Sequence, residues 1–147
     1  MELIQKQCKR SSVPVCEADI EKVKADAKKM LKICKTKYGR YPFAWAIAHC
    51  QVNHDNPLRF FVTIEGKTII NPKIQESSGV IKQLEGCYSY VHRNEVMKTR
   101  YKKVKVKFDL IDEKGKYHKD KVESFEDLWS RVFQHEIDHF NGMAIYS

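Results

Sequence analysis

Residues 124–142 read SFEDLWSRVFQHEIDHFNG, and this stretch decides how the rest of the chain is interpreted. It contains the sequence HEIDH, in which His135 and His139 are four residues apart. In a helix, residues four apart share one face, so both imidazoles can reach one metal ion while Glu136 lies beside them as a base. The stretch therefore predicts a metal site with its own proton acceptor.

The same stretch has the features of a buried helix. Ser124 followed by Asp127 is typical of a capping box, and Gly142 is placed to end the helix. Apolar residues recur at roughly helical spacing: Phe125, Leu128, Val132, Phe133, Ile137 and Phe140. Histidines and acids on a buried helix are costly unless they are paired or bound to a cation. The pattern alone does not decide between a metal site and a helix that contains these residues by chance.

A catalytic site of this type has three protein ligands and one open position, so a third ligand is needed. In a metzincin-like spacing the last histidine would fall at Ile145, and no Glu, His or Cys follows His139. The third ligand is therefore expected upstream. Cys87 has the best context, because it ends an apolar run and follows Gly86, which frees the backbone to turn tightly. Five rivals remain open: Cys50, His49, His54, His92 and His118.

The composition is that of a globular domain. With 147 residues, 42% of them hydrophobic and 31% charged, the chain can bury one core. No long apolar run or signal-peptide pattern is present, so no membrane partner is expected. The cysteines are odd in number and include no CxxC pair: Cys8, Cys16, Cys34, Cys50 and Cys87. Free thiols in a reducing cytoplasm are expected rather than a disulfide framework.

The net charge of +8 raises the question of a nucleic-acid partner. The lysines are spread along the chain and interleave with acids, so no sequence-specific nucleic-acid binding is expected. The densest run alternates with apolar residues and predicts the solvated face of a strand: Lys102, Lys103, Lys105 and Lys107. The alternative is a basic patch that docks on RNA or on an acidic surface.

Between the ends of the chain, strands dominate. Residues 1–15 are expected to be irregular, and an apolar stripe predicts a helix over residues 17–38 that stops at Gly39. Residues 41–52 form an apolar segment of undecided structure. Strands are expected at residues 60–64, 68–70, 80–84, 102–111 and 117–122. This order predicts an α+β fold in one domain over residues 1–147, with mixed or antiparallel sheets packed around the C-terminal helix and an N-terminal scaffold helix.

Three segments together resemble the peptide deformylase family. EGCYS at residues 85–89 matches the family's Glu-Gly-Cys-apolar-Ser motif, and NPKI at residues 71–74 is similar to its Asn-Pro-x-Ile segment. QHEIDHFNG at residues 134–142 matches Gln-His-Glu-x-Asp-His-x-x-Gly at every fixed position. The resemblance covers the chain from about residue 20 onward. Because the sequence ends soon after the last motif, it is similar to short deformylases that lack a C-terminal helix, including those that phages encode.

The family's first motif, Gly-x-Gly-apolar-Ala-Ala-x-Gln, is met only in part by AWAIAHCQ at residues 44–51. Ala44 and Ala46 stand at the two glycine positions, and His49 stands at the second alanine. The remaining positions agree: Ile47, Ala48 and Gln51. The substrate cleft is therefore the region in which this chain is expected to differ from the family.

The resemblance implies a metal-dependent hydrolase that removes the N-formyl group from the formyl-methionine of nascent polypeptides and releases formate. Glu136 would act as general base and then as general acid. The Gln51 amide and the Tyr88 N–H would surround the developing oxyanion. The implied metal ligands are Cys87, His135 and His139. The implied pocket for the methionine side chain comprises Ala46, Ile47, Leu128 and Val132, together with Tyr88.

The metal implied by the resemblance is Fe²⁺, whereas the raw affinity of a Cys-His-His site favours Zn²⁺, with Ni²⁺ or Co²⁺ as substitutes. Asp138 and Asn141 are expected to support the ligands or to cap the helix. The partners would be formyl-methionyl nascent peptides and, through a basic patch, the ribosome surface. Two alternatives are another metal-dependent amidohydrolase or peptidase, and a catalytically weak relative that binds the ribosome or a nascent chain.

Overall fold

The computed structural model describes residues 1–146 and has the predicted α+β fold, with antiparallel sheets and a helix near each end of the chain. The main sheet has the order β1-β2-β3-β6-β7, with β1 Ala46–Ala48, β2 Phe60–Thr63, β3 Thr68–Ser78, β6 Lys103–Ile111 and β7 Tyr117–Glu126. A separate ribbon pairs β4 Ile81–Glu85 with β5 Val96–Arg100. The helices are α1 Ile20–Cys34 and α2 Asp127–Phe140. The 3-10 turns are η1 Glu17–Asp19, η2 His49–Gln51 and η3 Tyr88–Tyr90.

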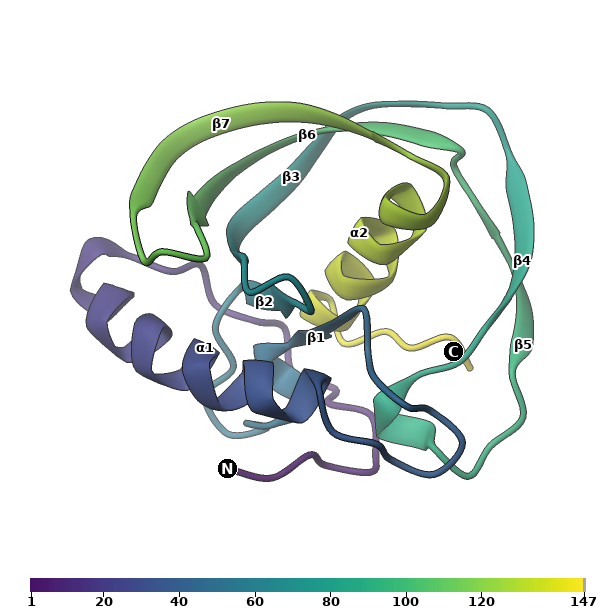
Figure 1. Cartoon of the computed structure of the whole chain (residues 1–147). Helices are drawn as coiled ribbons and strands as arrows, with labels where there is room; N and C mark the ends of the chain where they lie inside the picture. Colours follow the sequence, from purple (N-terminus) through teal and green to yellow (C-terminus); the bar gives the residue numbers. More distant parts are fainter. Residues whose placement is uncertain (147) are drawn as a thin grey trace.

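The side chains of β2 alternate between two hydrophobic cores, as the period of a strand requires. Phe60 and Val62 pack in one core with Met30 of α1, and Phe61 packs in the other core with Phe133 of α2. The two helices therefore cover different faces of the sheet. Figure 1 shows β3, β6 and β7 curving over α2, while the β4–β5 ribbon borders it on another side. This arrangement encloses the helix that carries both histidines.

The N-terminal segment lies beside the end of α2. Residues 1–15 contain no helix, as expected. An isolated β-bridge pairs Val13 with Leu58, which lies just before β2. The Ser12 N–H donates to the carbonyl of Phe140 over 2.7 Å. Further along, the Gln5 side chain donates to the Tyr88 carbonyl over 2.6 Å. The beginning of the chain is thus tied to α2 and to η3.

The predicted start of the last helix at Ser124 is wrong. Ser124 pairs with Lys105 in the ladder between β7 and β6, and Phe125 follows it in the same strand. The N-cap is Glu126, and the helix begins at Asp127. Because β7 runs directly into α2 with no turn residue between them, apolar positions of the strand extend the helical pattern backwards.

The ends of two other elements also differ from the prediction. The predicted helix over residues 17–38 is divided into η1 and a shorter α1, which ends at Cys34. Strand β3 continues past Pro72, although proline normally ends a strand. A register shift between Ile70 and Lys73, with Asn71 at a φ of 51°, lets the strand pass the proline as a bulge. Strands β1 and β5 were not predicted.

The predicted solvated lysine face lies on β6. Three of its lysines form long ion pairs with acids: Lys103 with Glu126 at 3.6 Å, Lys105 with Glu76 at 4.0 Å and Lys107 with Asp120 at 3.8 Å. Acids on the neighbouring strands thus balance these charges, and an exposed ion pair of this kind adds little stability. Within residues 1–146, no helix is both long and apolar enough to cross a lipid bilayer.

Candidate metal centre

Cys87 lies between the end of β4 and the turn η3, where it is buried. The expected role of Gly86 as a tight turn is wrong, because its φ is not in the left-handed region. A Cβ at Gly86 would instead lie 1.8 Å from the hydroxyl oxygen of Tyr41. The end of the tyrosine side chain occupies the space that a Cβ at residue 86 would need, so a larger residue there would have to displace Tyr41.

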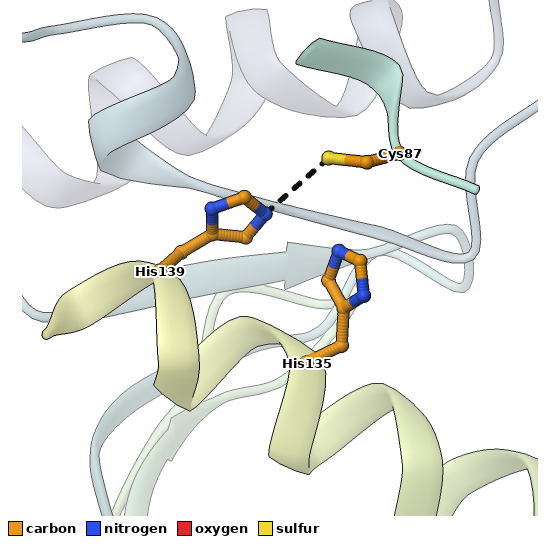
Figure 2. A group of neighbouring side chains, drawn as sticks. All are labelled: Cys87, His135 and His139. Atoms are coloured by element: carbon orange, nitrogen blue, oxygen red, sulfur yellow. Dashed lines mark hydrogen bonds between the residues drawn. The ribbon is translucent and has the colours of Figure 1, made fainter. Parts of the chain in front are cut away.

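Cys87, His135 and His139 form a group whose ligand atoms all lie within 4.8 Å of one another. We call this group the metal cluster. Figure 2 shows the two imidazoles projecting from successive turns of α2 toward the thiol, with Cys87 Sγ 3.4 Å from His139 Nε2. Burial and the neighbouring His135 lower the pKa of His139, so its imidazole is neutral. A neutral imidazole is the form that binds a metal ion.

A buried network of charges orients His135. Its Nδ1 donates to Glu85 over 3.2 Å, since a carboxylate can only accept, and this leaves Nε2 for the metal cluster. Arg100 donates to the same carboxylate through Nε at 3.1 Å and Nη2 at 2.8 Å, and its Nη1 donates to Asp138 at 2.6 Å. Although burial opposes it, hydrogen bonds from His135 and Arg100 bring the pKa of Glu85 down to about 2. A hydrogen bond from the other ring nitrogen to a carboxylate fixes the tautomer and the orientation of a metal-binding histidine.

Glu136 is a buried acid with an incomplete set of partners. Its side chain is 3% exposed, and its Oε2 has no hydrogen-bond partner. Burial raises the pKa of Glu136 to about 7. A buried carboxylate oxygen without a partner costs about 1–3 kcal/mol, so its position indicates that a bound group completes the site. A thiol and two imidazoles beside this acid fit a divalent transition metal and a proton-bearing ligand.

Gln51 is held beside the metal cluster by the turn η2. Its Oε1 accepts from the Ala48 N–H over 2.9 Å. Its Nε2 donates to Ser89 Oγ at 3.1 Å and lies 3.7 Å from Cys87 Sγ. The Tyr88 N–H belongs to the first turn of η3, where backbone N–H groups have no partner within the turn. The Gln51 amide therefore lies beside Cys87, and the Tyr88 N–H belongs to the residue that follows Cys87 in the chain.

A cavity of about 330 Å³ opens beside the metal cluster. Its lining includes Cys87, His135 and Glu136, together with Gln51 and Tyr88. Of the five residues expected to form the methionine pocket, four line the cavity: Ala46, Tyr88, Leu128 and Val132. Ile47 does not line it, because its side chain is fully buried in the core beneath α1.

The rival ligands are not part of the metal cluster, although Cys50 Sγ lies 3.6 Å from the His139 carbonyl oxygen. His49 Nε2 donates to Asp26 over 3.0 Å, and its Nδ1 accepts from the Leu58 N–H over 2.9 Å. His118 pairs with Asp112 in the β6–β7 hairpin at 2.9 Å. Within residues 1–146, the cluster of ligand atoms suited to a metal consists of the three residues named above, without Cys50, His54 or His92.

Three residues around the site were missed by the sequence analysis: Tyr41, Arg100 and Arg131. Tyr41 and Arg100 act across the fold, on Gly86 and on Glu85, and no local pattern marks such contacts. Arg131 precedes His135 by four residues, so helical spacing alone places it on the same face of α2. Asp138 and Asn141 have the expected supporting contacts, Asp138 with Arg100 and Asn141 as the C-cap of α2.

Comparisons with known proteins agree with this geometry. Among curated proteins, peptide deformylase 1 of Clostridium acetobutylicum is 41% identical over 76 residues, which cover 51% of this chain and 46% of that protein. The peptide deformylase of Carboxydothermus hydrogenoformans is 45% identical over 76 residues, covering 51% of this chain and 45% of that protein. The chain thus spans about half the length of the curated relatives it matches.

Solved structures match over nearly the whole chain. The crystal structure of peptide deformylase from Thermotoga maritima is 29% identical with a TM-score of 0.75, covering 99% of this chain and 97% of that one. A probable peptide deformylase from Synechococcus phage S-SSM7 is 26% identical with a TM-score of 0.76, covering 99% of this chain and 98% of that one. The sequence model of the family described as polypeptide deformylase matches residues 2–147, and the chain therefore belongs to the polypeptide deformylase family.

Proposed function

We propose that this protein is a metal-dependent hydrolase that removes the formyl group from the N-terminal formyl-methionine of nascent polypeptides. The observation that carries the proposal is the metal cluster, two of whose residues line a cavity, together with an unpartnered carboxylate oxygen of the lining residue Glu136. Membership of the deformylase family supports the same reaction. The products would be formate and a peptide with a free amino terminus.

Cys87, His135 and His139 would hold one divalent transition metal. When bound, the metal supplies a Lewis acid that lowers the pKa of water and polarises a carbonyl oxygen. Both Fe²⁺ and Zn²⁺ fit a donor set of one thiolate and two imidazoles, with Ni²⁺ and Co²⁺ as substitutes. The thiolate must lose its proton to bind, so metal binding would release protons and weaken as the pH falls.

Glu136 would move the proton that the reaction transfers. A general base works best when its pKa lies near the working pH, and burial places the pKa of Glu136 at about 7. The carboxylate would take a proton from the attacking water and deliver it to the leaving amine nitrogen. The Gln51 amide and the Tyr88 N–H would donate to the oxygen of the formyl group as negative charge develops on it.

We infer that residues 1–147 act as a single catalytic domain. The support is that strand β2 contributes side chains to both hydrophobic cores, so neither core is complete without it. Cys8, Cys16, Cys34, Cys50 and Cys87 are free thiols, which supports a reducing, cytoplasmic setting. Contact with the ribosome through basic residues stays a prediction, and co-sedimentation with ribosomes at graded salt concentrations would measure it.

The proposal is tested by measuring formate release from formyl-Met-Ala-Ser by the purified, metal-loaded protein. Glu136→Gln serves as the control, because it removes the base without removing a proposed ligand. We expect turnover by the wild type and little by the variant. Cleavage of unformylated peptides at internal bonds would instead support a peptidase. Absence of formate release from a fully metal-loaded wild type would refute the proposal.

A further inference from the structure

The cavity extends along one face of α2. Two turns of the helix line it through residues spaced by three or four positions: Leu128, Arg131, Val132, His135 and Glu136. Because each residue adds about 1.5 Å to the helix axis, Leu128 lies about 10 Å from His135 along the helix. A substrate with its formyl carbon at the metal cluster would therefore have room for its first side chain along the wall formed by Leu128, Arg131 and Val132.

Arg131 is unusual in this wall. Its Nη1 donates to the side-chain oxygen of Gln83 on β4, so the side chain bridges α2 and the β4–β5 ribbon. Its Nε is buried and has no hydrogen-bond partner. Among the described residues, no carboxylate forms an ion pair with it. A guanidinium stays charged in proteins and carries five N–H donors, so this cation has donors to spare at the edge of the cavity.

The surroundings of Arg131 restrict which group can use those donors. The neighbouring lining residues Leu84, Leu128 and Val132 are apolar, and they favour a side chain with a hydrocarbon stem. Three lining acids, Glu85, Glu95 and Glu136, would repel a negatively charged side chain. The group that fits is neutral, linear, and ends in a hydrogen-bond acceptor.

We propose that Arg131 is a specificity-determining residue that makes the cavity prefer a first side chain ending in a neutral hydrogen-bond acceptor over a hydrocarbon of equal length. The thioether of methionine is a weak acceptor, and the sulfoxide oxygen of oxidised methionine is a strong one. The enzyme would therefore also deformylate peptides that begin with formyl-methionine sulfoxide. This inference rests on the proposed function, since it concerns the same cavity and the same reaction.

The spacing of Arg131 and His135 along α2 supports this role of Arg131. Arg131 lies four residues, about 6 Å along the helix axis, from His135. The side chain of methionine is of similar length, so, laid along α2 from the metal cluster, it would reach the turn of the helix that carries Arg131. Sites built to hydrogen-bond a substrate discriminate strongly against an analogue that lacks the bonding atom, because the donor is then left without a partner.

The test compares three peptides, formyl-Xaa-Ala-Ser with norleucine, methionine or methionine sulfoxide as the first residue. For the metal-loaded wild type we expect kcat/KM to rise in that order, with the sulfoxide peptide about tenfold or more above the norleucine peptide. In Arg131→Leu the order should reverse, with norleucine preferred. Arg10→Leu, which removes an exposed arginine outside the cavity, should keep the wild-type order.

A second measurement separates binding from chemistry. In the Glu136→Gln background the peptides are expected to bind without being hydrolysed, and the fluorescence of Trp45, which lines the cavity, reports their Kd. The Kd ratio of norleucine to sulfoxide peptide should fall about tenfold when Arg131→Leu is added. Equal ratios with and without Arg131, or a wild type that prefers norleucine, would overturn the inference. If the wild type released formate from none of the three peptides, the proposed function would be refuted. The Kd ratios would still decide the role of Arg131.

Discussion

The protein contains two buried histidine–carboxylate pairs that differ in what the second ring nitrogen does. His135 donates to Glu85 across 3.2 Å, and His49 donates to Asp26 across 3.0 Å. In His49 the other nitrogen accepts the Leu58 N–H, so both nitrogens are used within the fold. In His135 the other nitrogen remains for the metal cluster. A carboxylate partner alone therefore does not mark a metal ligand, and what distinguishes His135 is that it also lies beside a thiol and another imidazole.

The two pairs also differ in their neighbours. The ring of His49 stacks on Phe60 with centroids 4.6 Å apart, inside a wall of apolar side chains. The ring of His135 stands 4.9 Å from that of His139 and close to a thiol. One histidine contributes to packing and connects α1 with the segment before β2. The other contributes to a site that a bound metal would complete.

Removing each histidine gives the largest expected contrast. His135→Ala should lose most of its bound metal and its turnover, because a three-ligand site becomes a two-ligand site. His49→Ala should keep the metal but lose about 2–4 kcal/mol of unfolding free energy, since it opens a cavity and leaves the Leu58 N–H without an acceptor. Metal content by atomic spectroscopy and urea denaturation measure the two effects. Full metal occupancy in His135→Ala would remove that residue from the ligand set.

Glu136, which follows His135, should affect turnover without affecting metal binding. Glu136→Gln should keep its metal while kcat falls about a hundredfold to ten-thousandfold, because a general base is lost and no proposed ligand is. Single-turnover formate release and metal content on the same sample test this. If the variant lost its metal instead, Glu136 would have to be counted as a ligand.

Replacing the carboxylate of each pair with the corresponding amide should give a smaller effect. Glu85→Gln should weaken metal binding about tenfold to a hundredfold, because it disturbs the orientation and basicity of His135. Asp26→Asn should leave metal affinity unchanged and lower the unfolding free energy by about 1–3 kcal/mol. Competition with a chelator gives the affinities. Similar metal affinity in the two variants would contradict the distinction between the pairs.

The smallest expected effect is a change in pH dependence. Burial lowers the pKa of His49 below its ordinary value of 6.5, and the pKa of Asp26 is also lowered. Stability from His49 is therefore complete above about pH 6.5 and is lost as the pH falls below it, by up to about 1.4 kcal/mol per pH unit. His49→Gln can keep both hydrogen bonds without titrating, so its unfolding free energy should fall less between pH 7 and 5.5. Equal pH slopes for the two proteins would show that His49 is not held neutral.

Much of this fold could be predicted from the sequence because its signals are local. The spacing of His135 and His139 and the apolar stripe of α1 depend on residues within a few turns of a helix. The start of α2 and the length of β3 could not be predicted, because each depends on strand pairing with β6. The contact of Tyr41 with Gly86 and the bridge from Arg131 to Gln83 join distant segments, and they became visible only in the folded chain.

The attachment of the N-terminal segment to α2 has a consequence for biosynthesis. Ser12 donates to Phe140, and Gln5 donates to Tyr88, so residues made early need partners that are made much later. Both histidines of the metal cluster also lie in α2. While the chain is being translated, Ser12 cannot make its hydrogen bond to Phe140 until α2 has left the exit tunnel of the ribosome. Cys87 and the two histidines can therefore come together only after α2 has been synthesised, and under the proposed function both metal binding and deformylation would have to wait for that step.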